Sequence, residues 1–233
     1  WPAMLLAYGD LNLPTNVPAN QYILIKGEKA SASRGVGKTL NDYLDEWNPD
    51  SLRYALASIL PEQNDSEISE DEMIRRNNEE LVAAWGNLVQ RVFSQYINNF
   101  ENLEFDFELN DVDKKIIDEG NDCFEKTGEL IEKVELKSSL QSVMGYVNKI
   151  NAYLNETEPW KVIKEDSSRA TAILHTSLTA IEACASLFTP FMPTTSEIVK
   201  GAIEKNTNNN WSVNDIKKGA PLQDIGHLFK KFD

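Results

Sequence analysis

The spacing of apolar positions changes near residue 68 and divides the chain into two regions. In residues 1–68 the apolar runs are short, and turn-forming residues separate them. From Ser69 onward, apolar residues recur every three or four positions over long stretches, which is the spacing of one buried helix face. The pattern predicts a small α/β unit over 1–68 and a mainly α region over 69–233.

The first region is predicted to contain one strand and three short helices. The aromatic and β-branched content of residues 21–25 favours a strand, and Lys26 and Gly27 end it in a turn. Pro14 and Pro18 mark a turn-rich stretch before it. The predicted helices cover residues 1–8, 39–44 and 51–59.

The second region is predicted to form an α-helical bundle. Ser69 and Glu72 have the spacing of a capping box at the start of its first helix. Pro159 begins a short additional helix at Trp160. Around five longer helices without a fixed-length repeat favour a bundle over a solenoid. They are expected over residues 69–92, 111–134, 136–154, 167–188 and 195–205.

Composition is that of a soluble globular protein. Of the 233 residues, 41% are hydrophobic and 26% charged, and no apolar stretch is expected to reach the roughly 18 residues of a membrane span. The chain lacks an initiator methionine and a signal peptide, so we expect it to start inside a longer protein. Cys123 and Cys184 lie far apart in helical patterns, which indicates buried, reduced thiols and a cytoplasmic location.

The net charge of −14 argues against a broad nucleic-acid-binding surface. Much of the acid lies in residues 62–72 and 101–122, which are interpreted as solvated surface. Any contact with nucleic acid must therefore be local and depend on a few residues.

The segment from Lys29 to Gly35 has the residue types of a phosphate-binding loop. Lys29 and Arg34 supply cations, Ser31 and Ser33 supply hydroxyl donors, and Gly35 permits positive φ. An ordinary solvated loop explains the same residues equally well, because such short runs are common.

A second candidate site combines residues far apart in sequence. Asn87 and Arg91 are four residues apart on one helix face, and Trp160 follows Pro159 at a helix start. An amide, a guanidinium and an indole can read and stack unpaired bases. From pattern alone, the preferred alternative is that Trp160 fills the core and Arg91 pairs with a carboxylate.

Several segments occur in the order expected for one enzyme family. They are residues 1–7 (Trp-Pro-Ala-Met-Leu-Leu-Ala), 27–35 (Gly-Glu-Lys-Ala-Ser-Ala-Ser-Arg-Gly), 50–54, 77–81, 86–91 and 158–160 (Glu-Pro-Trp). Together they resemble the carboxyl-terminal half of methionyl-tRNA synthetases. The resemblance covers most of the chain and weakens after about Met192.

The resemblance implies a class I aminoacyl-tRNA synthetase that joins methionine to its tRNA using ATP with Mg²⁺. Residues 1–68 would be the end of a Rossmann catalytic domain with a stem-contact region, and residues 69–233 the anticodon-binding domain. The family's Lys-Met-Ser-Lys-Ser loop falls on residues 29–33. It implies catalytic roles for Lys29, Ser31 and Ser33, and contacts of Lys29, Ala32 and Arg34 with ATP phosphates.

The same resemblance assigns the anticodon contacts. Asn87 and Arg91 would read the first base of a CAU anticodon, and Trp160 would stack beneath it.

The chain departs from the family pattern in two places. Ala32 stands where the second signature lysine is expected, which removes a charge-assisted contact that Arg34 or Lys38 would only partly replace. The family's His-containing ATP motif is absent, since the chain has only His175 and His227. We therefore expect this piece to be inactive alone.

Two alternatives stay open at this point. The chain could be the anticodon domain of a synthetase for leucine, isoleucine, valine or cysteine, although Asn87, Arg91 and Trp160 argue against it. It could also be a non-catalytic helical protein-interaction module, which Ala32 and the acidic charge favour.

Overall fold

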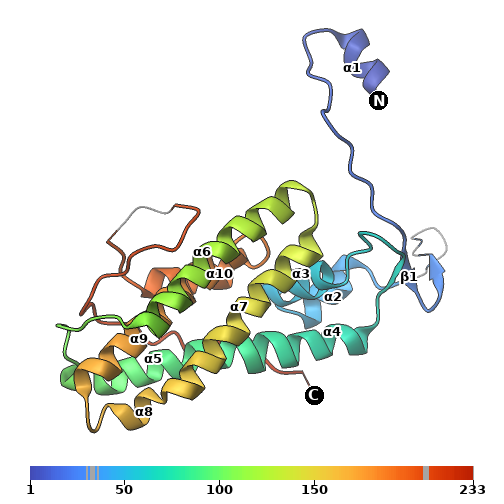
Figure 1. Cartoon of the computed structure of the whole chain (residues 1–233). Helices are drawn as coiled ribbons and strands as arrows, with labels where there is room; N and C mark the ends of the chain where they lie inside the picture. The colour runs from blue at the N-terminus through green and yellow to red at the C-terminus, as the bar shows by residue number, and fades with distance from the viewer. Residues whose placement is uncertain (30, 32–34, 36, 207–209, 233) are drawn as a thin grey trace.

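The structure is a computed structural model of residues 1–233, of which 30, 32–34, 36, 207–209 and 233 lie outside the described residues. Figure 1 shows an elongated helical body with a small sheet at one end and an amino-terminal segment that extends away from it. That segment carries α1 (Pro2–Tyr8), a helix with no buried residue. The predicted helix over 1–8 is thus confirmed, and it packs on nothing in the described chain.

A three-stranded sheet lies between the amino-terminal segment and the bundle. Its strands are β1 (Ile23–Ile25), β2 (Glu28–Lys29) and β3 (Ser66–Glu67), in the order β2-β1-β3. β1 pairs antiparallel with β2 and parallel with β3. The strand predicted over 21–25 is confirmed in its second half. The two-residue strands β2 and β3 are too short to produce an alternation, so the sequence did not predict them.

Two capped helices follow the sheet. α2 (Leu40–Glu46) begins with a capping box between Thr39 and Asp42, and α3 (Pro49–Ser58) begins at Asn48, whose Oδ1 accepts from the Asp50 N–H at 2.9 Å. α3 is tied to the corner between the last two helices of the bundle. Arg53 Nε donates to the Phe191 carbonyl at 2.9 Å, and Asp50 Oδ2 accepts from the Thr195 N–H at 2.6 Å.

One continuous helix runs from Glu70 to Asn99 with a change of register in its middle. Its parts are α4 (Glu70–Arg76), the π-helix η2 (Asn77–Gly86) and α5 (Asn87–Asn99), followed by the 3₁₀ turn η3 (Phe100–Asn102). The predicted capping box at its start is wrong. The Ser69 side chain makes no cap hydrogen bond, because the Glu72 carboxylate instead accepts from the guanidinium groups of Arg75 and Arg76.

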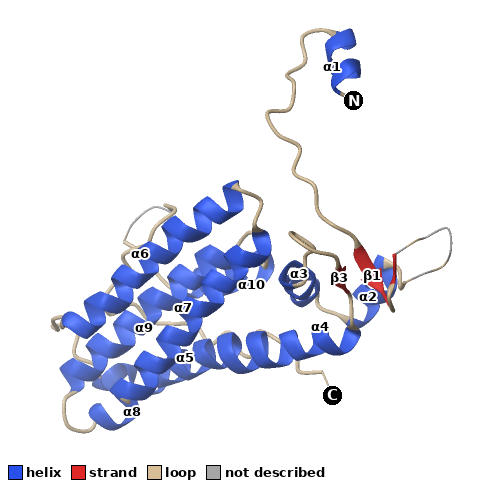
Figure 2. Ribbon diagram, turned by 45° about the vertical axis from the view of Figure 1, so that its right-hand side comes forward, coloured by secondary structure: helices blue, strands red, loops and turns tan. Residues whose placement is uncertain are grey.

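The bundle is completed by α6 (Asp111–Glu132), α7 (Leu136–Thr157), α8 (Pro159–Val162), α9 (Ser167–Phe188) and α10 (Pro193–Ala202). α9 is its central helix and packs against α5, α6, α7, α8 and α10 (Figure 2). Eighteen of its 22 residues are buried. The predicted helical bundle is confirmed.

α9 also corrects one expectation from the sequence. By length and composition alone it could cross a membrane, but 94% of its most apolar 18-residue window is buried inside the protein. Small residues such as Ala180 and Ala183 let five other helices approach it, so its apolar character is that of a core helix.

The cysteines and histidines have structural positions. Cys123 on α6 and Cys184 on α9 are buried free thiols, as expected. His175 is buried on α9, with its ring centroid 5.1 Å from that of Phe107, and burial lowers its pKa to about 4. His227 is exposed near the carboxyl terminus.

Candidate functional site

Asn87 and Arg91 lie on consecutive turns of α5, directly after the π-helix. Asn87 is the first residue of α5 and is exposed, while Arg91 is half-buried. The opposite side of this helix is apolar, and Leu88, Val89 and Val92 belong to the main core. Burial of that side directs the amide and the guanidinium outward.

Trp160 lies at a sharp corner between α7 and α8. Glu158 occupies the left-handed region (φ 42°) and ends α7, and Pro159 begins the four-residue helix α8. This corner keeps Trp160 half-buried, with part of its ring against the main core. The indole is therefore not sealed in the interior.

The structure brings Arg91 and Trp160 together from opposite halves of the bundle sequence. The Arg91 guanidinium carbon lies 5.3 Å from the centroid of the Trp160 ring, within the range of a cation–π contact. Arg91 Nη2 also donates to Asn155 Oδ1 at 2.8 Å. Asn155, near the end of α7, is a contact that sequence reasoning missed, because a lone polar residue on an exposed helix face carries no motif.

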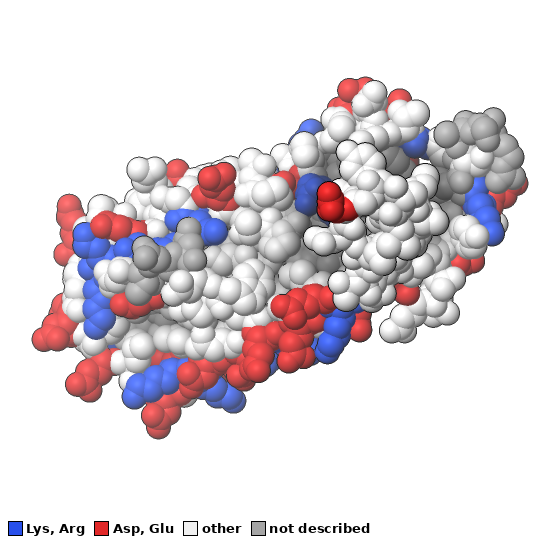
Figure 3. Space-filling view, turned by 90° about the horizontal axis from the view of Figure 1, so that it is seen from above, with Lys and Arg blue, Asp and Glu red and all other residues white. Residues whose placement is uncertain are grey.

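Charge near this cluster is mixed. The Lys161 ammonium pairs with the Glu158 carboxylate at 2.6 Å, beside Trp160. Figure 3 shows the molecule from above, a view that faces away from α5 and α8, and there acidic and basic side chains occur in separate groups. The ion pair beside Trp160 agrees with the expectation that any contact with nucleic acid is local.

The phosphate-binding candidates lie at the other end of the long helix. Lys29 ends β2, and its Nζ lies 3.4 Å from the centroid of the Tyr22 ring. Ser31 is half-buried, and Gly35 has φ 68°, the positive φ that its place in the sequence suggested. Ala32, Ser33 and Arg34 lie outside the described residues.

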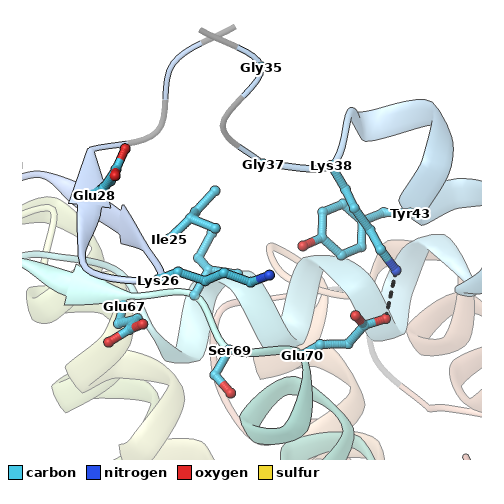
Figure 4. A pocket seen from close by; sticks show the side chains of 11 residues that line it. Ile25, Lys26, Glu28, Gly35, Gly37, Lys38, Tyr43, Glu67, Ser69 and Glu70 are labelled. Carbon is cyan, nitrogen blue, oxygen red and sulfur yellow. Dashed lines mark hydrogen bonds and ion pairs between the residues drawn. The ribbon is translucent and has the colours of Figure 1, made fainter.

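A pocket of about 610 Å³ adjoins this loop, between the sheet and the start of α4 (Figure 4). Lys38 closes one side of it. Its ammonium lies 2.8 Å from the Glu70 carboxylate and 3.4 Å from that of Glu46, and the hydrogen bond that it donates to Glu70 raises the pKa of Lys38. Glu28 and Glu67 also line the pocket. With these carboxylates present, its described walls do not by themselves make a complete triphosphate site.

Metal-binding chemistry is not found in the part of the chain that the structure describes. There, no group of three or more His, Cys, Asp or Glu residues could hold a metal ion. Mg²⁺ that arrives with a nucleotide needs only one or two carboxylates besides the phosphates, so it does not require such a group.

Two family models match the chain. Residues 1–93 match the model of class I tRNA synthetases (M), and residues 107–233 match the model of the anticodon-binding domain of methionyl tRNA ligase. Together they cover both regions that the sequence distinguished. The second model alone spans more than half of the chain.

Curated relatives agree with these models. The chain is 39% identical to a methionine–tRNA ligase of Roseiflexus castenholzii, covering 100% of this chain and 44% of that protein. It is 38% identical to a methionine–tRNA ligase of Chloroflexus aggregans, covering 84% of this chain and 36% of that protein. The chain thus spans less than half the length of these relatives.

Solved structures share the fold. A methionyl-tRNA synthetase of Mycobacterium tuberculosis in complex with methionyl-adenylate superimposes with a TM-score of 0.84 at 22% identity, over 98% of this chain and 46% of that one. The apo form of that enzyme gives a TM-score of 0.83. Because the family models and these relatives all concern methionine, they support the methionyl assignment over another class I synthetase. The chain therefore belongs to the methionyl-tRNA synthetase family, with a class I synthetase region followed by an anticodon-binding domain.

Proposed function

We propose that this chain is the tRNA-recognising part of a methionine–tRNA ligase, and that it binds the CAU anticodon loop through Asn87, Arg91 and Trp160. The observation that carries the proposal is the Arg91 guanidinium lying 5.3 Å from the Trp160 ring centroid, one helical turn from the exposed Asn87 amide. A flat stacking surface with an amide and a guanidinium at its edge suits a splayed, unpaired base.

Arg91 and Trp160 together form a surface, called the ledge below, that has a direct physical role in this proposal. The first anticodon base stacks on the exposed part of the indole, and stacking on such a ring contributes about 1–3 kcal/mol per base. Asn87 and Arg91 then donate hydrogen bonds to the edge of the base. Asn155 holds the guanidinium in place through its Oδ1 atom.

In the whole protein, the proposed reaction is attachment of methionine to tRNA with ATP. Lys29, Ser31 and Ser33 would hold the leaving pyrophosphate, where negative charge develops as the adenylate forms. Ala32 and Arg34 would lie against the ATP phosphates, and Mg²⁺ would arrive with the nucleotide and neutralise phosphate charge. The upstream half that the relatives possess would complete this site, and the reaction would take place in the cytoplasm.

We also propose a boundary at residue 68 between the catalytic end and the anticodon-binding domain. Residues 1–68 hold the sheet and the signature loop, and residues 69–233 begin with the long helix. The two family matches meet farther along, between residues 93 and 107.

The test is a binding titration of this chain with labelled anticodon stem-loops. We expect tighter binding to a CAU loop than to one with a changed first base, and we expect Trp160→Ala to abolish that preference. Trp1→Ala is the matched control, because Trp1 is a strongly exposed indole next to a helix with no buried residue. Equal binding to both loops, or equal losses in both variants, would refute the proposal.

A further inference from the structure

A second cavity lies beside Asn87, between the long helix and the carboxyl-terminal segment. It has a volume of about 250 Å³, with Gly86, Asn87 and Gln90 on the helix side and His227 and Phe229 on the other. This is smaller than typical small-molecule sites of roughly 300–1,000 Å³ and is suited to a single flat heterocycle. Asn87 borders both this cavity and the ledge formed by Arg91 and Trp160.

The cavity wall is held in place by the π-helix. Asn77 Nδ2 donates to the Lys230 carbonyl at 2.9 Å. Asn78 Oδ1 accepts from the Phe232 N–H at 3.0 Å, and its Nδ2 donates to the Phe232 carbonyl at 2.8 Å. These bonds fix the carboxyl-terminal segment along the helix, near which the terminus lies in Figure 2. The cavity is thus preformed.

One wall residue has an unmet hydrogen-bonding need. Gln90 Oε1 is shielded from solvent and has no hydrogen-bond partner among the described residues. A buried acceptor without a donor is costly, and the cost disappears when a ligand supplies the donor. An amide places an acceptor and a donor side by side, which matches a nucleobase that carries an exocyclic amine next to a ring nitrogen.

We infer that this cavity takes one splayed base of the anticodon loop and that Gln90 Oε1 accepts a hydrogen bond from the exocyclic amine of that base. The inference rests on the proposed function and adds a second contact to it. In a CAU anticodon, cytosine and adenine carry such an amine and uracil does not. The proposed function places the first base on Trp160, and neither Trp160 nor Arg91 lines the cavity. The cavity therefore takes the second base, adenine.

The test combines removal of the amine with removal of the amide. Three stem-loops are compared: CAU, a loop with uracil as first base, and a loop whose second base is unsubstituted purine. Each is titrated against the chain and against Gln90→Met, which keeps the size of the side chain. The matched control is Gln95→Met, on the same helix and outside the cavity.

We expect the unchanged chain to bind the loop with the unsubstituted purine about tenfold more weakly than CAU. Gln90→Met should bind CAU about tenfold more weakly than the unchanged chain and should no longer discriminate at that position, whereas Gln95→Met should behave as the unchanged chain. Discrimination at the first base should persist in Gln90→Met, because it depends on Trp160. Full discrimination by Gln90→Met at the second base overturns the inference.

A second variant covers the case in which Gln90→Met does not fold. His227 is exposed at the cavity rim, so His227→Trp should narrow the entrance without disturbing the core. It should weaken CAU binding about tenfold, and unchanged affinity would overturn the inference.

If Trp160→Ala abolishes CAU preference while both cavity variants bind normally, only this inference fails. If the unchanged chain shows no CAU preference, the proposed function fails.

Discussion

At the scale of single residues, burial decides which polar groups are free to act. Arg91 stays half-buried against an indole and an asparagine, whereas His175 is buried on the core helix α9 and takes no part in the candidate site. Spacing alone favoured a carboxylate partner for Arg91, whereas the structure places it against Trp160 and Asn155. The burial of His175 is set by α9 being covered on all sides, which no local pattern encodes.

His175 should make stability depend on pH. Burial lowers its pKa from 6.5 to about 4, so the unfolded chain binds a proton that the folded chain does not. The stabilisation of the folded state that depends on neutral His175 is complete above pH 6.5. It is lost as pH falls toward 4, and over this range the free energy of unfolding decreases by about 1.4 kcal/mol per pH unit. In urea titrations at several pH values, His175→Gln should lose less stability than the unchanged protein over this range. Parallel plots of the free energy of unfolding against pH for the two proteins would contradict the prediction.

Ala32 supports a prediction about catalysis that rests on the sequence alone. In the protein joined to its upstream half, Ala32→Lys should restore a charge-assisted phosphate contact and raise the rate of ATP–pyrophosphate exchange about tenfold to a hundredfold. Affinity for the anticodon stem-loop serves as the control and should not change. An unaltered exchange rate would show that another group already supplies this contact.

At the scale of elements, the π-helix is the unusual feature. The i→i+5 hydrogen bonds of η2 widen the turn between Asn77 and Gly86, just before Asn87. Its first two residues hold the carboxyl-terminal segment, and its last residue is a glycine packed against that segment. Such π segments are often found at functional sites, which agrees with the position of the candidate cluster.

A substitution at Gly86, the last residue of the π-helix, tests the packing at this end of η2. A Cβ at Gly86 would lie 3.0 Å from the Leu81 carbonyl oxygen and 3.4 Å from Phe229. Gly86→Ala should therefore destabilise the protein by about 1 kcal/mol, although Gly→Ala ordinarily stabilises a helix by a similar amount. Gly145→Ala on α7 is the matched control, since a Cβ there meets nothing within 4 Å, and it should be stabilising. Denaturant midpoints of the two variants that shift in the same direction would contradict this prediction.

At the scale of the whole molecule, one helix connects the two candidate sites. Glu70, paired with Lys38 beside the loop, and Arg91 lie 21 residues apart, or about 30 Å along a helix. α3 is bonded to the corner of α9 and α10, so the small α/β unit and the bundle are held together. Both sites belong to a chain with a net charge of −14.

This charge predicts a weak dependence of RNA binding on salt. With a local site on an unpaired loop, we expect only about two to three phosphates to be neutralised, which gives a slope of log K against log salt of roughly −1.5 to −2. A titration of the CAU stem-loop between low and physiological salt measures this slope. A much steeper slope would indicate an extended basic surface and contradict a local site.

The sequence by itself determined the helical bundle and most helix boundaries, and it supplied candidate residues for the two sites. These depend on local information: apolar spacing, proline and asparagine at helix starts, and short motifs such as Glu158-Pro159-Trp160. It also indicated the family, because several motifs occur in one order.

Only the tertiary structure decided how those residues meet. The contact of Arg91 with Trp160, the bond to Asn155 and the cavity at Gln90 each join segments far apart in the chain. The pairing of Glu72 with two arginines, the π register and the burial of α9 likewise follow from competition among neighbours in space. Local patterns specify which face of an element is buried, whereas packing of all elements together specifies what that face meets.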